Sequence, residues 1–167
     1  MEQLVIHGGH PLRGHVKIGG AKNAVLPIIA AALLGTNGKS VLDEVPALED
    51  VYTITAVLRA LGVTADYTVS EHRLVIDASH IATVAAPYDL VRKMRASFLI
   101  MGPLLAREGH AEISLPGGCA IGTRPIDLHL KGFEALGAEI EITQGDIHAR
   151  APHGLKGARI YFDFPSV

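Results

Sequence analysis

The only cysteine of the 167-residue chain, Cys119, lies in the glycine-rich stretch SLPGGCAIGTRPID, which spans residues 114–127. The glycines on both sides of it let a ligand approach the backbone closely. Arg124, five residues later, and the helix start expected after it would both favour a thiolate. A thiolate is a strong nucleophile, and a thiol can also donate a proton. The alternative is an inert cysteine that packs as a small hydrophobic side chain.

The helix expected over 125–136 offers a second candidate site, for an anion. Pro125 suits the first helical position, and the free N–H groups of the first turn lie beside Arg124. Backbone N–H groups, a partial positive charge and a guanidinium together are well suited to phosphate. Asp127 could accept hydrogen bonds from a ligand. It could equally cap the helix and compensate its dipole.

Two more groups of polar and basic residues stand at helix starts. Lys22 and Asn23 follow a glycine pair in IGGAKNA, and Arg92 and Arg95 share one face of a helix expected over 88–107. A cation at the positive end of a helix is unfavourable unless an anion meets it. A bound carboxylate or phosphate would explain both groups. Solvated basic side chains are the alternative in each case.

The elements that must position these residues alternate between strand-like and helical runs, which indicates an α/β or α+β fold. Helices are expected at 23–34, 48–61, 88–107 and 125–136. Strands are expected at 3–8, 15–20, 39–45, 64–69, 73–78, 110–116, 138–143, 146–151 and 158–164.

An internal repeat organises these elements. Each copy reads as a helix, a strand, a helix and a two-stranded hairpin. The copies are 70 residues apart at Pro46 and Pro116 but 77 apart at Asp50 and Asp127, so the second copy carries a net insertion of seven residues. The insertion contains the cysteine. Extra loop residues on a repeated scaffold usually serve binding or chemistry.

Composition excludes several classes of function. A formal net charge of −2, no tryptophan and 5% aromatic residues argue against nucleic-acid binding. The nine histidines are scattered, so no metal site is expected. No apolar run reaches the roughly 18 residues of a membrane span, and the N-terminus lacks the layout of a signal peptide. With one cysteine and no internal disulfide, a soluble cytoplasmic protein is expected.

Four stretches spread over the chain resemble the N-terminal part of the UDP-N-acetylglucosamine enolpyruvyl transferases (1-carboxyvinyltransferases). They are GGAKNAVLPIIAAALL, APYDLVRKMRASFLIMGPLLAR, LPGGCAIGTRPIDLHLKGFEALGA and FPSV. The resemblance implies an inside-out α/β barrel of repeated βαβαββ units, incomplete in this chain. Residues 1–20 would be strands that pack with another domain. Residues 21–167 would form two of three units of the domain that carries the cysteine loop, at about 112–124.

The resemblance also implies a reaction (EC 2.5.1.7). The enolpyruvyl group of phosphoenolpyruvate moves to the 3-hydroxyl of UDP-N-acetylglucosamine, and phosphate is released. This is the first committed step of peptidoglycan synthesis, on which cell shape and division depend, and it needs no metal or organic cofactor.

Residue roles follow from the same resemblance. Cys119 matches the cysteine that bonds covalently to phosphoenolpyruvate and is the target of fosfomycin. Lys22, Arg95 and Arg124 match the cations that hold phosphoenolpyruvate and phosphate, and Asn23 matches a residue near the sugar hydroxyls. The positions matching the UDP site are Arg124, Pro125, Ile126, Asp127, Leu128, Ser166 and Val167.

Members of this family are more than twice as long as this chain, and the acidic residue that takes the sugar hydroxyl proton lies in the part not matched. The chain alone is therefore expected to be an inactive N-terminal fragment. A complementing C-terminal chain, or self-association, would have to complete it. The alternatives are a non-catalytic module that binds a nucleotide sugar with a partner chain and a free-standing thiol enzyme of another class. No nucleic acid or membrane is expected as a partner.

Overall fold

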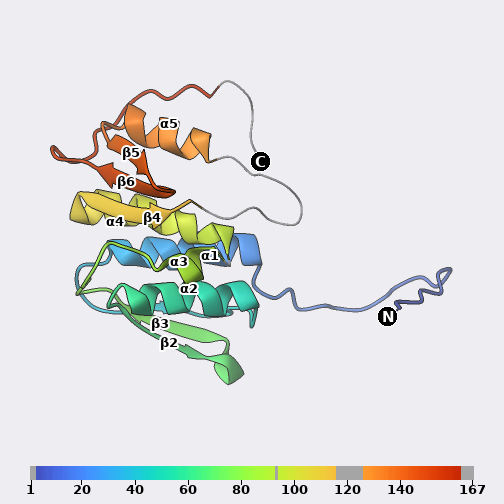
Figure 1. Ribbon diagram of the computed structural model, residues 1–167. Coiled ribbons are helices and arrows are strands. Elements are labelled where there is room, and N and C mark those ends of the chain that lie inside the picture. The colour runs from blue at the N-terminus through green and yellow to red at the C-terminus, as the bar shows by residue number, and fades with distance from the viewer. Residues whose placement is uncertain (1–2, 93, 116–125, 163–167) are drawn as a thin grey trace.

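The computed structural model of the chain describes residues 3–92, 94–115 and 126–162, and of Arg95 only the backbone. Residues 3–20 extend away from the folded part as a solvent-exposed arm (Figure 1). The strands predicted at 3–8 and 15–20 do not form, and none of the described strands pairs with either run. The arm's exposed large apolar side chains are Leu4, Val5, Ile6, Leu12, Val16 and Ile18.

The folded part contains the predicted order of elements twice. The first unit comprises α1 (Lys22–Ala31) with the 3₁₀ turn η1 (Ala32–Leu34), β1 (Ser40–Leu42), α2 (Glu49–Ala60), β2 (Thr64–Thr68), η2 (Val69–Glu71) and β3 (Arg73–Asp77). The second comprises α3 (Tyr88–Val91), η3 (Arg95–Ile100), α4 (Met101–Glu108), β4 (His110–Ser114), α5 (Asp127–Ala135), β5 (Glu139–Thr143) and β6 (Asp146–Arg150).

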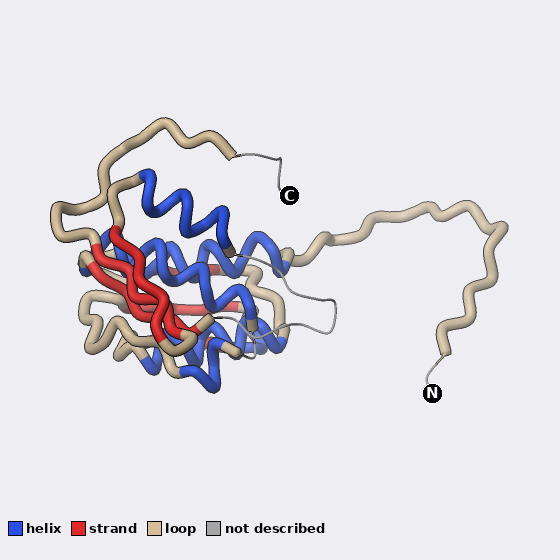
Figure 2. The backbone as a smooth tube through the Cα atoms, turned by 45° about the horizontal axis from the view of Figure 1, so that its top comes forward, coloured by secondary structure: helices blue, strands red, loops and turns tan. Residues whose placement is uncertain are grey.

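Each unit contains a three-stranded antiparallel sheet. The strand order is β1-β3-β2 in the first unit and β4-β6-β5 in the second. The registers correspond as well. Val75 of β3 pairs with Val41 and Asp66 on its two sides, and His148 of β6 pairs with Glu112 and Glu141. α1, α2, α3 and α4 lie between the two sheets, whereas α5 lies beyond β5 and β6 in the view of Figure 1; Figure 2 shows the same helices and strands from another side. Alternate residues of the central strands face these helices, as with Leu74 and Ile76 of β3.

The prediction of one continuous helix over 88–107 is wrong for the middle of this range. The chain forms α3, an extended residue at Met94 (φ −141°, ψ 116°), a six-residue 3₁₀ helix and then α4. The extended residue redirects the chain so that Val91 and Met94 are both buried. The strand predicted over 158–164 is absent from its described residues, 158–162, and α5 begins at Asp127 with Ile126 before it.

Two glycines show both the repeat and its local variation. Gly62 and Gly137 each follow the last turn of a helix, with positive φ angles of 88° and 93°. A Cβ at Gly62 would lie 2.5 Å from the Cβ of Ala82, whereas a Cβ at Gly137 would meet no atom within 4 Å. Both positions need the left-handed conformation that glycine adopts easily, but only Gly62 also lacks space.

The two units enclose one hydrophobic core. Its most deeply buried side chains come from α1, α2, β3 and α4, and they include Ile29, Ile54, Leu58, Leu74, Ile76, Met101 and Leu104. Among the described helices, none has the length and apolarity needed to span a bilayer.

Candidate functional site

The helices of the two units run in the same direction, and their starts lie at one end of the molecule (Figure 1). At this end the ammonium of Lys22, on α1, contacts the carboxylate of Asp50, on α2. Phe98 of η3 meets the ring of His129 on α5 edge to face, with centroids 5.4 Å apart. At the opposite end, Arg107 near the end of α4 donates to the carbonyl of Leu33 at the end of η1.

The described residues on either side of the cysteine-containing stretch lie at this same end. β4 follows α4 after a left-handed glycine and packs against it, so the strand runs back towards the helix starts. Leu115, the last described residue after β4, donates its N–H to the carbonyl of Gly145. Ile126, where the description resumes, is buried directly before α5. Cys119, Arg124 and Pro125, which were predicted to belong to the site, fall outside the described residues.

Lys22 is the first residue of α1, and the residue before the helix provides no side-chain cap. Its Nζ lies 2.9 Å from Oδ2 of Asp50, and 52% of the lysine side chain is exposed. Asp50 stands in the first turn of α2, where a negative charge is favourable. The amine is therefore partly neutralised and remains accessible to a ligand. Asn23, the next residue of α1, is also exposed.

The entry into α1 is fixed by the close approach of Gly20 to the turn after β1. A Cβ at Gly20 would lie 2.2 Å from the carbonyl oxygen of Glu44, whereas one at Gly19 would meet no atom within 4 Å. Glu44 is held in a left-handed conformation (φ 58°), and its carboxylate accepts a hydrogen bond of 2.8 Å from Lys17. That hydrogen bond is the main reason why the pKa of Glu44 lies below its usual value. Gly20 thus sets where Lys22 begins its helix.

The remaining predicted site residues divide into two groups. Arg95 begins η3, Asp127 begins α5, and Leu128, partly buried, follows it; all three positions lie at the end where the helices start. Ser166 and Val167 fall outside the described residues. The structure therefore brings the helix starts that carry Lys22, Arg95 and Asp127 to one end of the molecule.

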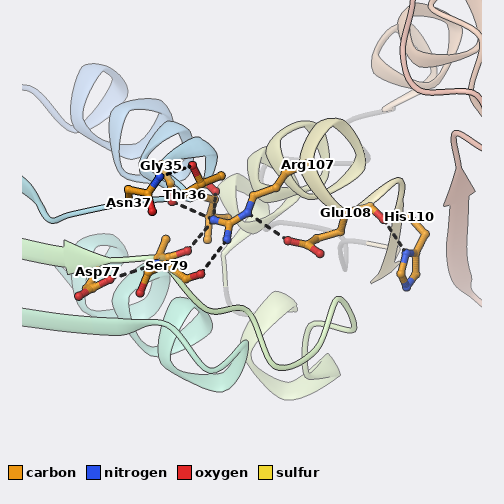
Figure 3. A network of polar contacts seen from close by, with 10 residues as sticks. Gly35, Thr36, Asn37, Asp77, Ser79, Arg107, Glu108 and His110 are labelled. Carbon is orange, nitrogen blue, oxygen red and sulfur yellow. Dashed lines mark hydrogen bonds and ion pairs between the residues drawn. The ribbon is translucent and has the colours of Figure 1, made fainter.

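Asp50 was not predicted as part of the site, although the repeat gave a signal for it, because it is the counterpart of Asp127 in the first unit. Arg107 was also missed. Its guanidinium donates to the carbonyls of Leu33 at 2.8 Å and Gly35 at 2.9 Å, and also to those of Ala78 and Ser79 (Figure 3). These contacts join the second unit to the first at the opposite end of the helices.

The arrangement can bind an anion. The first turns of parallel helices present unpaired N–H groups and aligned dipoles towards the same end. A lysine ammonium stands among them, and such an end is suited to phosphate or carboxylate groups. Within the described residues, no group of three histidine, cysteine, aspartate or glutamate side chains is placed to hold a metal ion.

Comparison with known proteins gives matches over nearly the whole chain. Residues 6–167 match the family model of EPSP synthase (3-phosphoshikimate 1-carboxyvinyltransferase). Over all 167 residues the chain is 63% identical to UDP-N-acetylglucosamine 1-carboxyvinyltransferase 2 of Carboxydothermus hydrogenoformans, of which it covers 39%. It is 57% identical to UDP-N-acetylglucosamine 1-carboxyvinyltransferase 1 of Staphylococcus aureus strain N315, of which it covers 40%.

Solved structures show the same fold. The enolpyruvyl transferase NikO from Streptomyces tendae matches 90% of this chain with a TM-score of 0.73 at 25% identity, and the match covers 32% of that protein. EPSP synthase from Acinetobacter baumannii matches 77% of the chain with a TM-score of 0.59 at 15% identity. The chain thus spans only about 40% of the length of the curated relatives that it matches.

Proposed function

Because the chain belongs to the EPSP synthase (3-phosphoshikimate 1-carboxyvinyltransferase) family, we propose that it supplies one half of an enolpyruvyl transferase site. The substrates would be phosphoenolpyruvate and UDP-N-acetylglucosamine, and phosphate would be released on the way to peptidoglycan in the cytoplasm. One observation carries this choice of acceptor: the identity of 63% to a relative named for UDP-N-acetylglucosamine, against 15% to an EPSP synthase structure.

The proposed roles follow the position of each residue. Lys22, Arg95 and Arg124 would hold the phosphate and carboxylate of phosphoenolpyruvate, which suits an end of the molecule where helix starts gather. Cys119 would donate a proton to phosphoenolpyruvate or bond to it covalently. Asn23 would face the sugar hydroxyls. The UDP group would contact Pro125, Ile126, Asp127, Leu128, Ser166 and Val167.

The site requires a second half. The chain covers 39% of its Carboxydothermus relative, and the base for the sugar hydroxyl is expected in the remaining part. The experiment supplies that part as a separate chain and measures phosphate release from phosphoenolpyruvate and UDP-N-acetylglucosamine. We expect release only when both chains are present, and we expect Lys22→Met to abolish it. Turnover by the 167-residue chain alone would contradict the half-site proposal.

A second candidate, a non-catalytic module that binds the nucleotide sugar together with a partner chain, is favoured by the same partial coverage. It predicts binding of UDP-N-acetylglucosamine to the two-chain mixture without phosphate release, so the assay separates the two proposals. Fosfomycin gives a further test of the thiol. Mass spectrometry should show labelling of Cys119 in the assembled protein and not in the denatured chain. Equal labelling of both would show that the fold does not activate the thiol.

A further inference from the structure

The ion pair between Lys22 and Asp50 is the contact that joins the starts of two helices from the first unit. Nζ and Oδ2 lie 2.9 Å apart, and the two side chains are 52% and 30% exposed. The lysine is at the positive end of α1, which disfavours it, whereas the aspartate is at the positive end of α2, which favours it. The carboxylate therefore compensates a cation that its own helix does not.

A ligand that uses Lys22 has to approach this carboxylate. An anionic oxygen in contact with Nζ would come within about 4 to 6 Å of the Asp50 carboxylate, the range in which like charges disfavour each other measurably. Against this repulsion stands a benefit, because the ion pair restricts a flexible lysine side chain before the ligand arrives. For exposed pairs this benefit is small, and a phosphate dianion feels the repulsion on both of its charges. We therefore expect repulsion to outweigh preorganisation.

We propose that Asp50 is an internal counter-ion of Lys22. The Asp50 carboxylate holds the Lys22 ammonium between the starts of α1 and α2, and a phosphate-bearing ligand must compete with this carboxylate for the ammonium. The inference rests on the proposed function in one respect, namely that Lys22 binds the anion. Its consequence is specific to this residue. Asp50 lowers the affinity of the site for free phosphate, the product of the proposed reaction, and so favours its release.

The experiment uses the two-chain mixture described under the proposed function and two measurements. The first follows the NMR signal of the Lys22 ε-methylene group, assigned with Lys22→Arg, in the wild type and in Asp50→Asn. The second is a titration with inorganic phosphate. Glu49→Gln is the matched control, because this substitution removes the same charge from the same helix turn. Glu49 is exposed and has no ion pair with Lys22 among the described contacts. Asp50→Glu keeps the charge.

We expect Asp50→Asn to shift the Lys22 signal and to tighten phosphate binding about fivefold, equivalent to about 1 kcal/mol. Glu49→Gln and Asp50→Glu should leave both measurements close to the wild type. An unchanged Lys22 signal, or phosphate affinity in Asp50→Asn equal to or weaker than in Glu49→Gln, would overturn the inference. If Lys22→Met binds phosphate as the wild type does, or if no variant binds it, the assignment of Lys22 to the anion site fails instead, and the counter-ion role falls with it.

Discussion

Replacement of Arg107 by methionine should destabilise the chain more than any other single loss of an arginine in its described part. The Arg107 side chain is only 12% exposed, and its guanidinium bonds to four backbone carbonyls, two from η1 and the residue that follows it and two from the segment after β3. Methionine fills most of the volume of the side chain but leaves these carbonyls without their donor. The substitution therefore tests polar contacts between the units with little change in packing.

The magnitude follows from the number and kind of bonds. A hydrogen bond from a charged donor contributes roughly 1.5–3 kcal/mol. Contributions that share one guanidinium are not additive, and water will reach some of the freed carbonyls. We therefore expect Arg107→Met to lower the free energy of unfolding by about 3 kcal/mol, and Arg107→Lys by about 1 to 2 kcal/mol, because an ammonium lacks the planar fork. For a chain of this size, 3 kcal/mol corresponds to a melting temperature lower by about 6–12 °C.

Urea denaturation followed by circular dichroism provides the assay, with a lower midpoint and an unchanged slope as the expected result. Arg59→Met is the matched control. Arg59 donates a hydrogen bond of 2.8 Å to the carbonyl of Ala65, and the loss of this one charged hydrogen bond should cost about 1.5 kcal/mol. If Arg107→Met proved no more destabilising than Arg59→Met, the four carbonyl contacts would not join the two units as argued.

Three further predictions use the local geometry. Gly62→Ala should destabilise the fold by about 3 kcal/mol, from a positive φ angle and a steric overlap, whereas Gly137→Ala should cost only about 1 kcal/mol; equal urea midpoints would contradict the difference in space. Gly20→Ala should weaken phosphate binding because it displaces the start of α1, and Gly19→Ala should not, so a matching loss in both variants would count against that contact. Hydrogen bonds from the side chain and the backbone N–H of Ser79 lower the pKa of Asp77. The ionised Asp77 carboxylate therefore stabilises the fold at pH values above the ordinary aspartate pKa, and this stabilisation is lost as the pH falls through the lowered pKa of Asp77. Asp77→Asn should make the free energy of unfolding depend less on pH over this acidic range, as measured by urea denaturation at a series of pH values.

The repeated order of helices and strands could be predicted from the sequence because it depends on local patterns. Helix starts, apolar spacing and the glycines that end α2 and α5 recur at nearly constant offsets. The break at Met94 could not be predicted, because Val91 and Met94 are apolar and three residues apart, as in an unbroken helix. The strand predicted at 15–20 has the right alternation, but a strand needs a partner, and none is present beside it.

Part of the candidate site was also predictable. Lys22 next to a glycine pair at a helix start is an unfavourable placement, and such placements indicate a ligand. The sequence marks Asp50 only through its correspondence to Asp127 in the repeat, because an acidic residue in the first turn of a helix is common and favourable. Its role depends on which helix lies beside α2, and that is tertiary information. Arg107 was missed for a related reason, since its partners are backbone carbonyls, which every residue carries.

The equivalent helices of the two units, α2 and α5, are buried to different extents. α2 packs against α1, α3 and η3, and it buries Val51, Ile54 and Leu58 completely. α5 occupies the equivalent place in the second unit and has no fully buried residue, although Phe133 packs beside Gly102 of the second unit's own helix. Equivalent helices with similar apolar spacing should bury similar surfaces. The difference in burial between α2 and α5 therefore comes from the elements that pack against each helix. Among the described elements, α5 has its most extensive contacts with β5, whereas α2 also packs against helices, and a further helix packed against α5 would reduce this difference in burial.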